Sequence, residues 1–211
     1  CSADLIDDFE SAETGSSAGW EQEGGWQYDN AVGISVAEFQ GSKMLKADLD
    51  YTGCEGFTWS EAKIKKSFAE GLDVSAYNVL SYEMIYPEAF DGSFKAKIFA
   101  KNGADDVEII NKEAKIETSD LGDGYKKAVV TVKFSPNTAK ITDLMIGTVG
   151  VSTAFLGSVY LDNLTLSQYN AAGDYTEITE TAGEAVLADT SSMPEEVTLS
   201  DVNASDRKSV V

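Results

Sequence analysis

The stretch that decides the fold is EGFTWSEAKIKKSF, residues 55–68, in which aromatic or charged side chains alternate with small or apolar ones. Every second side chain of a β-strand points to the same face, so Trp59, Glu61 and Lys63 would share one face. Ile64 and its small neighbours would point to the other. Because charged groups need water, the stretch predicts a strand with one buried face and one wet face that carries a tryptophan.

The same texture continues outward from this strand, from Asp4 to about Tyr169. Short apolar or alternating runs are separated by clusters of Gly, Asn, Asp and Ser, and runs with a helical period are nearly absent. Nine strands are predicted: 4–10, 33–40, 43–51, 57–68, 79–87, 94–101, 125–134, 142–150 and 158–169. Turns are expected at 100–106, 120–125 and 135–139. The pattern is typical of an all-β fold, a two-sheet antiparallel β-sandwich of the jelly-roll type.

The composition changes after Tyr169. Residues 171–211 are rich in Thr, Ser, Ala and Glu and contain neither tryptophan nor phenylalanine, so they cannot build a core of their own. We expect residues 1–170 to form the sandwich and residues 171–211 to be a linker or tail leading to a downstream domain. Cys1 would be either the lipidated residue of a mature bacterial lipoprotein or simply the point where the sequence starts.

Charge and composition exclude several classes of function. Acidic residues number 36 against 16 basic ones, a formal net charge of -20, which disfavours nucleic acids, anionic membranes and acidic glycans as partners. No run of about 18 apolar residues is present, so no membrane span is predicted. The chain has no histidine, and its two cysteines lack zinc-ligand spacing. The charge suits an extracellular or cell-surface protein with a neutral ligand.

Aromatic residues in polar company point to the ligand. GWEQEGGWQYDN places Trp20, Trp26 and Tyr28 among glycines and polar residues, and strand parity groups Phe99 with lysines. Sugar rings present a flat patch of C–H groups that packs against such rings, while charged groups bind the hydroxyls. The predicted binding residues are Trp20, Trp26, Tyr28, Trp59, Glu61, Lys63 and Phe99. For Trp20 and Trp26 the alternative is a plug at the end of the sandwich.

Carboxylates within apolar runs near both ends of this region indicate a metal site. Asp8 and Glu10 lie in LIDDFES, and Asp162 lies in SVYLDNLTLS. A calcium ion with carboxylate and carbonyl ligands would compensate buried acids and tie the terminal strands together. A carbonyl near Lys43 is the expected fourth ligand. The alternative is that these acids are solvated on an edge strand.

The combination of LIDDFES, GW…GGW, GSKMLKADLDYTG and FLGSVYLDNLTLS resembles β-sandwich carbohydrate-binding modules of bacterial plant cell-wall hydrolases. The similarity covers roughly residues 4 to 169. It is greatest to the mannan-binding family-27 type, and families 23 and 35 are related. The resemblance implies a non-catalytic module that targets an attached glycoside hydrolase to β-1,4-mannan, glucomannan or galactomannan, with a structural calcium held by the DDFE and YLDN acids.

The resemblance also implies a groove lined by tryptophans, to which Trp26 and Trp59 correspond in approximate placement. A third ring is expected from a set that lacks tryptophan: Tyr82, Tyr86, Phe90, Phe99 or Tyr125. The tail resembles the approach to a family-26 β-mannanase domain, so the chain would be a monomeric targeting portion of a multidomain enzyme. The alternatives are a jelly-roll glycosidase or lyase, for which no carboxylate pair can be assembled, and an adhesin-like surface domain.

Overall fold

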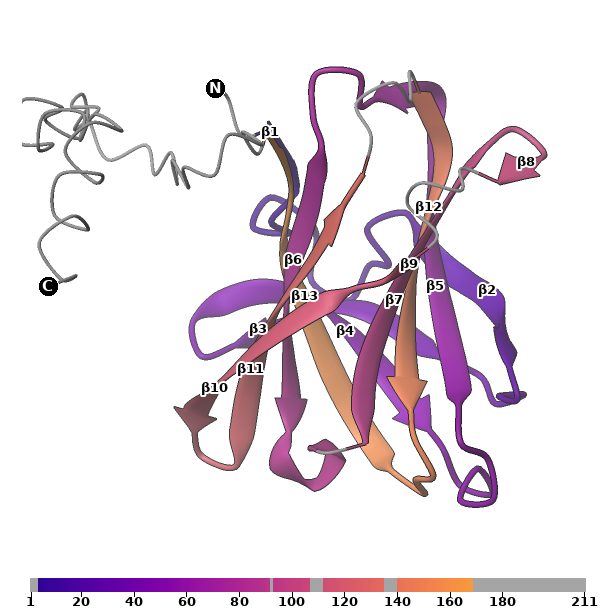
Figure 1. The fold of residues 1–211 in the computed structure, drawn as a ribbon. Helices are drawn as coiled ribbons and strands as arrows, with labels where there is room; N and C mark the ends of the chain where they lie inside the picture. The colour runs from indigo at the N-terminus through magenta and orange to yellow at the C-terminus, as the bar shows by residue number, and fades with distance from the viewer. Residues whose placement is uncertain (1–3, 92, 107–111, 135–139, 169–211) are drawn as a thin grey trace, which may run out of the picture. The chain divides into compact units, whose positions relative to one another are not determined.

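The computed structural model describes residues 4–91, 93–106, 112–134 and 140–168 (Figure 1). The chain divides into two units, Cys1–Thr176 and Glu177–Val211. The described residues all belong to the first unit. The predicted boundary at residue 170, the tail at 171–211, Cys1 and the turn at 135–139 lie outside the described residues.

Two antiparallel sheets form a sandwich (Figure 1). In the first sheet the order is β10 (Lys115–Gly122), β11 (Tyr125–Lys133), β6 (Val79–Pro87), β13 (Leu156–Ser167), β4 (Ser42–Asp50) and β3 (Gly33–Phe39), and β1 (Asp4–Asp7) also pairs with β13. In the second sheet the order is β2 (Trp20–Trp26), β5 (Ser60–Asp73), β12 (Lys140–Gly150), β7 (Phe94–Asn102) and β8 (Asp105–Asp106), and β9 (Lys112–Glu113) also pairs with β7. The predicted jelly-roll sandwich is thereby confirmed. In the described ranges, no helix is long and apolar enough to cross a membrane.

The core lies between the sheets and is rich in aromatic rings. Phe90, in the short 3-10 helix η1 (Glu88–Phe90), stacks on Phe155 with centroids 4.2 Å apart. Tyr86 stacks on Phe94 at 4.6 Å. Tyr82, Tyr86 and Phe90 are each at most 1% exposed, so these three rings are unavailable as the expected third platform of a groove.

Four strands were not predicted. β2 and β10 carry mostly polar side chains, because each strand lies at the edge of its sheet and is largely exposed. β8 and β9 have two residues each and carry no pattern. Trp59 stands directly before β5 rather than inside it.

Two predicted binding residues are core residues. Trp20 is 2% exposed and Tyr28 is 3% exposed, so the prediction that these rings face a ligand is corrected. A β-bulge between Gln22 and Gly25 shifts the register of β2. Trp20, before the bulge, therefore faces the core, whereas Trp26, after it, lies on the opposite face. Tyr28 turns inward to pack on Tyr51, with centroids 4.9 Å apart, and its hydroxyl oxygen accepts a hydrogen bond from the Asp50 amide.

Candidate functional site

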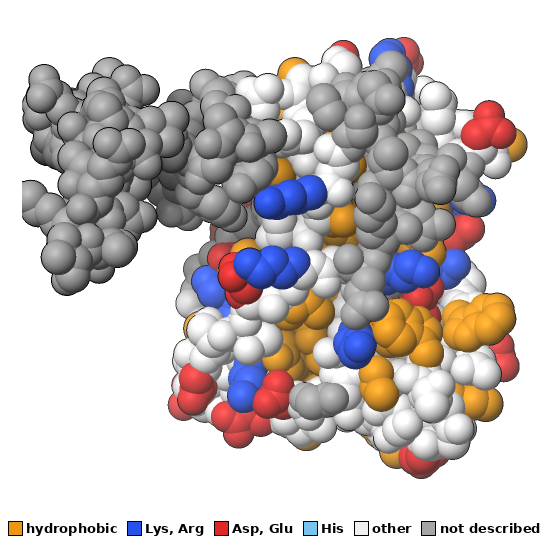
Figure 2. Space-filling model, in the orientation of Figure 1, with side chains coloured by type: hydrophobic (Ala, Val, Ile, Leu, Met, Phe, Trp, Pro, Cys, Tyr) orange, Lys and Arg blue, Asp and Glu red, His pale blue; other side chains and the backbone are white. Residues whose placement is uncertain are grey.

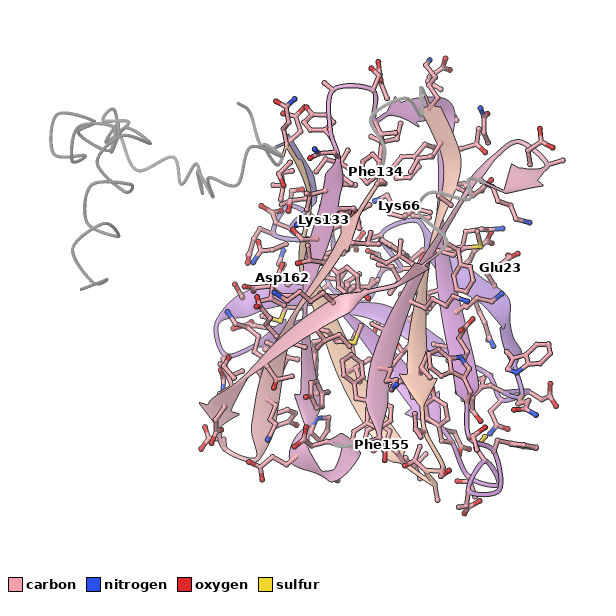
Figure 3. All side chains as sticks on the ribbon, viewed as in Figure 1. Glu23, Lys66, Lys133, Phe134, Phe155 and Asp162 are labelled. Atoms are coloured by element: carbon pink, nitrogen blue, oxygen red, sulfur yellow. The ribbon has the colours of Figure 1, made fainter. Side chains whose placement is uncertain are left out.

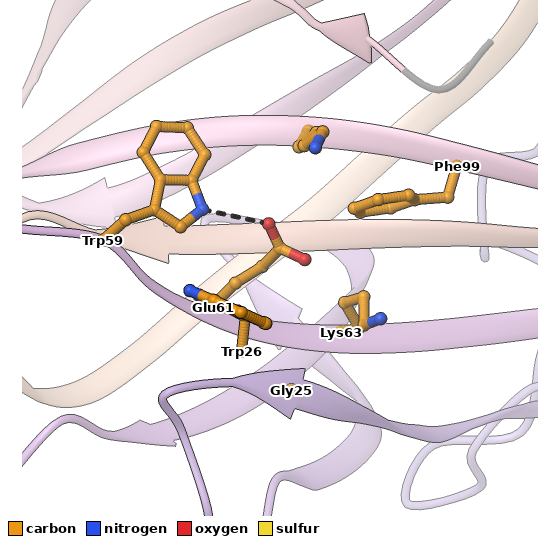
Figure 4. A pocket seen from close by; sticks show the side chains of 7 residues that line it. Gly25, Trp26, Trp59, Glu61, Lys63 and Phe99 are labelled. Carbon is orange, nitrogen blue, oxygen red and sulfur yellow. Dashed lines mark hydrogen bonds between the residues drawn. The ribbon is translucent and has the colours of Figure 1, made fainter. Parts of the chain in front are cut away.

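A hollow of about 360 Å³ opens on the outer face of the second sheet. Its lining comes from β2, from β5 and the residue before it, and from β7 (Figure 4). The lining residues are Gly25, Trp26, Trp59, Glu61, Lys63, Lys97 and Phe99. Figure 2 shows apolar side chains beside lysines on the side of the sandwich where β5 and β7 lie. We refer to these seven residues as the groove.

Strand register explains why these residues meet. Gly147 of β12 pairs with both Lys63 of β5 and Lys97 of β7, so these three residues form one outward-facing row across three strands. A second row contains Lys65, Met145 and Phe99. A third row contains Trp26, Glu61, Val149 and Lys95. The groove therefore crosses the sheet over β12, which lies between β5 and β7.

Trp59 and Glu61 are joined directly. The indole Nε1 of Trp59 donates a hydrogen bond of 3.1 Å to Oε2 of Glu61 (Figure 4). Glu61 is only 4% exposed although it lies on the outer face, and Trp59 is half-buried. The Nζ of Lys95 lies 5.6 Å from the centroid of the Trp59 ring. The orientation of the Trp59 ring is thus set by a carboxylate and a cation.

Trp26 projects from the opposite wall of the groove. It pairs with Glu61 in the register between β2 and β5, and its side chain is 64% exposed. No other described aromatic residue is as exposed. An indole left in water has no favourable packing of its own, so its placement beside a half-buried indole suits a ligand with flat apolar faces.

Phe99 lies at the other end of the groove between two ammonium groups. Lys63 Nζ is 5.0 Å and Lys97 Nζ is 4.8 Å from the ring centroid. Within the described part of the chain, neither lysine forms an ion pair, whereas Lys65 is paired with Glu21 at 3.0 Å and Glu23 at 2.9 Å. The hydrogen bonds that the Lys65 ammonium group donates to Glu23 and Glu21 raise the pKa of Lys65. Lys63 and Lys97 therefore keep donor capacity for a ligand.

The groove is equipped for binding. It combines aromatic rings with donors on the lysines and an acceptor on Glu61, which are the contacts that a sugar ring with hydroxyls takes. Glu61 is the acid among the lining residues. The two-carboxylate mechanism of glycoside hydrolysis requires an acid on each side of the scissile bond.

The structure brings five of the seven predicted binding residues to one groove: Trp26, Trp59, Glu61, Lys63 and Phe99. Their roles toward a ligand stay predictions. Sequence reasoning did not assign roles to Lys97, Gly25 or Gly147. Lys97 was readable from strand parity, which places it on the face of Phe99, and Gly147 was readable as a glycine inside an otherwise apolar strand.

The predicted calcium ligands come from the outer side of the first sheet. The pKa of Asp162 is raised to about 6, chiefly by burial and also by the charges of Glu83, Glu10 and Asp8, although a hydrogen bond from the Asn163 amide lowers it. Asp162 is 6% exposed. Figure 3 labels Asp162 on β13. Several carboxylates thus act on one buried acid.

The fit of these residues to a metal ion is incomplete. Among the described residues no group of three acidic or cysteine side chains is arranged to hold a metal ion. Glu10 Oε1 accepts hydrogen bonds from Ser42 Oγ at 2.7 Å and from the Lys43 amide at 3.2 Å. The ammonium group of Lys43 donates to the Ala12 carbonyl at 2.9 Å. The oxygens present are of the type that calcium takes, but side chains must move to gather round one ion.

A family model described as carbohydrate binding module 27 matches residues 1–169. Among curated proteins, no sequence matches the chain at a significant level.

Solved structures share the fold. TmCBM27, a carbohydrate-binding module described for specific mannan recognition, matches with a TM-score of 0.54 and 22% identity over 81% of this chain and 100% of its own. CBM27-1 of Caldicellulosiruptor saccharolyticus, solved with mannohexaose, matches with a TM-score of 0.57 and 18% identity over 81% of this chain and 100% of its own. CBM28, a module specific for non-crystalline cellulose, matches with a TM-score of 0.57 and 16% identity over 80% of this chain and 97% of its own.

Proposed function

This chain belongs to carbohydrate-binding module family 27, and from that premise we propose that its groove binds β-1,4-mannan, as galactomannan, glucomannan or mannooligosaccharides. The observation that carries the proposal is the pair of tryptophans, one 64% exposed and one half-buried, that face one hollow across a buried glutamate. The structural likeness to two modules described with mannan or mannohexaose supports the choice of sugar.

Six of the seven groove residues contact the sugar in this proposal. Trp26 and Trp59 stack on the apolar faces of successive sugar rings, and Phe99 provides the third ring. Glu61 accepts hydrogen bonds from hydroxyls through the carboxylate oxygen that Trp59 does not use. Lys63 and Lys97 donate hydrogen bonds to hydroxyl oxygens at the Phe99 end.

An affinity-gel panel tests the choice of sugar. The purified chain is run in native gels that contain galactomannan, glucomannan, xylan or mixed-linked β-glucan, with bovine serum albumin as the unretarded control. We expect retardation by both mannans and release of no reducing sugar from them. Retardation by xylan or β-glucan alone would overturn the mannan assignment, and release of reducing sugar would overturn the assignment as a binding module.

We also propose one structural calcium ion at Asp8, Glu10 and Asp162 with a carbonyl near Lys43. The support is that the charges of Glu83, Glu10 and Asp8 all act on the buried Asp162. When bound, the ion would supply positive charge that offsets carboxylate repulsion and joins the segment after β1 to β13. The role is structural, because the groove lies on the other sheet.

We propose finally that the module acts outside a bacterial cell, as a monomeric part of a β-mannanase. The support is the net charge of -20, which suits a neutral polysaccharide, and the resemblance of residues 171–211 to the approach to a family-26 hydrolase domain. The polypeptide with its downstream region should release reducing sugar from mannan in the culture medium, whereas the present chain should not.

A further inference from the structure

Gly147 occupies a position where its backbone does not require glycine. Its φ angle lies outside the left-handed region, so any L-residue would tolerate this backbone conformation. It lies inside β12 and pairs with strands on both sides. Glycine weakens a strand interior because it lacks a side chain to pack and gains freedom on unfolding. The reason for glycine at this position must therefore be space.

Glu61 occupies that space. A Cβ atom added at Gly147 would lie 3.1 Å from Cγ and 3.2 Å from Cδ of Glu61. Both atoms belong to the part of the side chain that sets the position of the carboxylate. The neighbouring outward residues of β12, Met145 and Val149, are buried, so the floor of the groove is filled on both sides of this gap.

The Glu61 carboxylate in turn holds the indole of Trp59. The bond from Trp59 Nε1 to Glu61 Oε2 is charge-assisted, and Glu61 is almost fully shielded from water, which strengthens the interaction. The other oxygen, Oε1, has no hydrogen-bond partner among the described residues. It is also not among the side-chain atoms of these residues that are both fully buried and unpaired. One oxygen thus positions the ring and the other stays open to the groove.

We propose that Gly147 and Glu61 are positioning residues: the missing side chain at Gly147 admits the Glu61 side chain, and Glu61 fixes the Trp59 ring in the orientation that the ligand meets. The positioning itself holds in the sugar-free protein. Its effect on affinity rests on the proposed mannan-binding function. Fixing the ring before the ligand arrives lowers the entropy cost of binding.

Nitrogen-15 NMR of the indole N–H groups tests the positioning without sugar. The chain has three tryptophans, and Trp59→Phe identifies the resonance of Trp59. In Gly147→Ala and in Glu61→Ala we expect the Trp59 N–H resonance to move upfield and its exchange with water to accelerate. Glu61→Gln keeps an acceptor oxygen and should retain most of the wild-type shift. The resonance of the buried Trp20 is the internal reference.

Gly56→Ala is the matched control, because a Cβ there meets no atom within 4 Å and the residue lies near Trp59 in sequence. It should leave the Trp59 resonance unchanged. Gly147→Ala should lower the affinity for mannohexaose about fivefold to tenfold, because the Trp59 ring would then be ordered only on binding.

Wild-type Trp59 resonances in both Gly147→Ala and Glu61→Ala would overturn the proposal. Glu61→Ala keeps the test valid if Gly147→Ala does not fold. If the groove does not bind mannan, the result is different: Trp59→Ala and the wild type would then show equal affinity for mannan, whatever the N–H resonances show.

Discussion

The Nζ of Lys66 lies 2.5 Å from Oδ2 of Asp7, which joins β5 in one sheet to β1 in the other. Lys66 shares the inward face of β5 with Ala62 and Ile64, and Figure 3 labels it between the sheets. Its ammonium group also lies 5.9 Å from the Trp20 ring centroid. A lysine is tolerated at this end of the core because a carboxylate and an aromatic ring meet it.

Lys66→Met should therefore destabilise the fold. The side chains of Lys66 and Asp7 are 20% and 17% exposed, so removing the lysine leaves a largely buried carboxylate without its partner. We expect a loss of about 2 kcal/mol in the free energy of unfolding, measured by urea denaturation. Lys65→Met is the control, because Lys65 pairs with Glu21 and Glu23 on the outer face and should cost about 0.5 kcal/mol. Equal losses in the two variants would contradict this account.

Trp20 and Trp26 show where sequence reasoning succeeds and where it stops. They are six residues apart, so a regular strand would place both rings on one face. Trp20 pairs with Lys66 and Trp26 pairs with Glu61, and the one-residue shift between these pairs places the rings on opposite faces. Gly24 and Gly25 mark the bulge, and a glycine pair inside a strand is the available signal for it. Its position became certain only with the register of β5.

In regular strands, the alternation of side chains along the chain was sufficient to predict which residues share a face. It placed Glu61 and Lys63 with Trp59, and Lys97 with Phe99, and the structure brings these residues to one groove. It did not reveal that Glu61 is 4% exposed, because that burial depends on a glycine 86 positions later in the chain. Long-range packing of this kind leaves no local pattern. The two-sheet fold depends on many short alternating runs and was readable for that reason.

Replacing either groove tryptophan by alanine should weaken mannan binding. Trp26→Ala removes a ring that is 64% exposed, so the fold should be unaffected while affinity falls about tenfold, as for a central aromatic anchor. Trp59→Ala should lose at least as much. Isothermal titration with mannohexaose measures both. Leu156→Ala is the matched control, since Leu156 is 71% exposed and does not line the groove. Undiminished affinity in Trp26→Ala would remove Trp26 from the binding site.

Gly25→Ala should destabilise the protein and distort the groove. A Cβ at this position would lie 2.6 Å from the backbone carbonyl oxygens of both Glu61 and Tyr28, and backbone atoms cannot give way as a flexible side chain can. We expect a loss of about 1 to 3 kcal/mol in unfolding free energy by thermal denaturation. Gly56→Ala has open space around its Cβ and should be neutral. A neutral Gly25→Ala would mean that β2 does not approach β5 this closely.

Buried tyrosines should limit stability at high pH. Burial, together with the charge of Asp91, raises the pKa of Tyr86 to about 12, and burial raises the pKa values of Tyr51 and Tyr82 beyond that. In the unfolded chain these groups ionise near pH 10, so their contribution is complete below pH 10. The contribution of Tyr86 is lost as the pH rises through 12, and those of Tyr51 and Tyr82 are lost at still higher pH. Absorbance at 295 nm should therefore show these three groups ionising only with loss of the near-ultraviolet circular dichroism. Their titration at pH 10 in the folded protein would contradict the prediction.

Tyr82→Phe should raise the melting temperature. The Tyr82 hydroxyl is fully buried and has no hydrogen-bond partner among the described residues. Removing it eliminates the cost of a buried unsatisfied polar group, for an expected gain of about 1 kcal/mol. Tyr86→Phe is the comparison, because the Tyr86 hydroxyl donates to Asp91 at 3.2 Å and its loss should not stabilise. A lower melting temperature in Tyr82→Phe would show that the hydroxyl makes a favourable bond.

Calcium should stabilise the fold without acting in the groove. Asp162 is 6% exposed, and its pKa is raised by burial and by the charges of Glu83, Glu10 and Asp8, so a divalent cation would offset the repulsion among these groups. Excess chelator should lower the melting temperature, and added calcium should restore it in proportion to the logarithm of its concentration above the dissociation constant.

Asp162→Asn should abolish this dependence, whereas Asp29→Asn, which removes the same charge from an exposed position, should retain it. Affinity for mannohexaose should be equal with and without calcium at temperatures where both forms are folded. A melting temperature that does not respond to chelator would show instead that these acids are compensated by their hydrogen bonds alone.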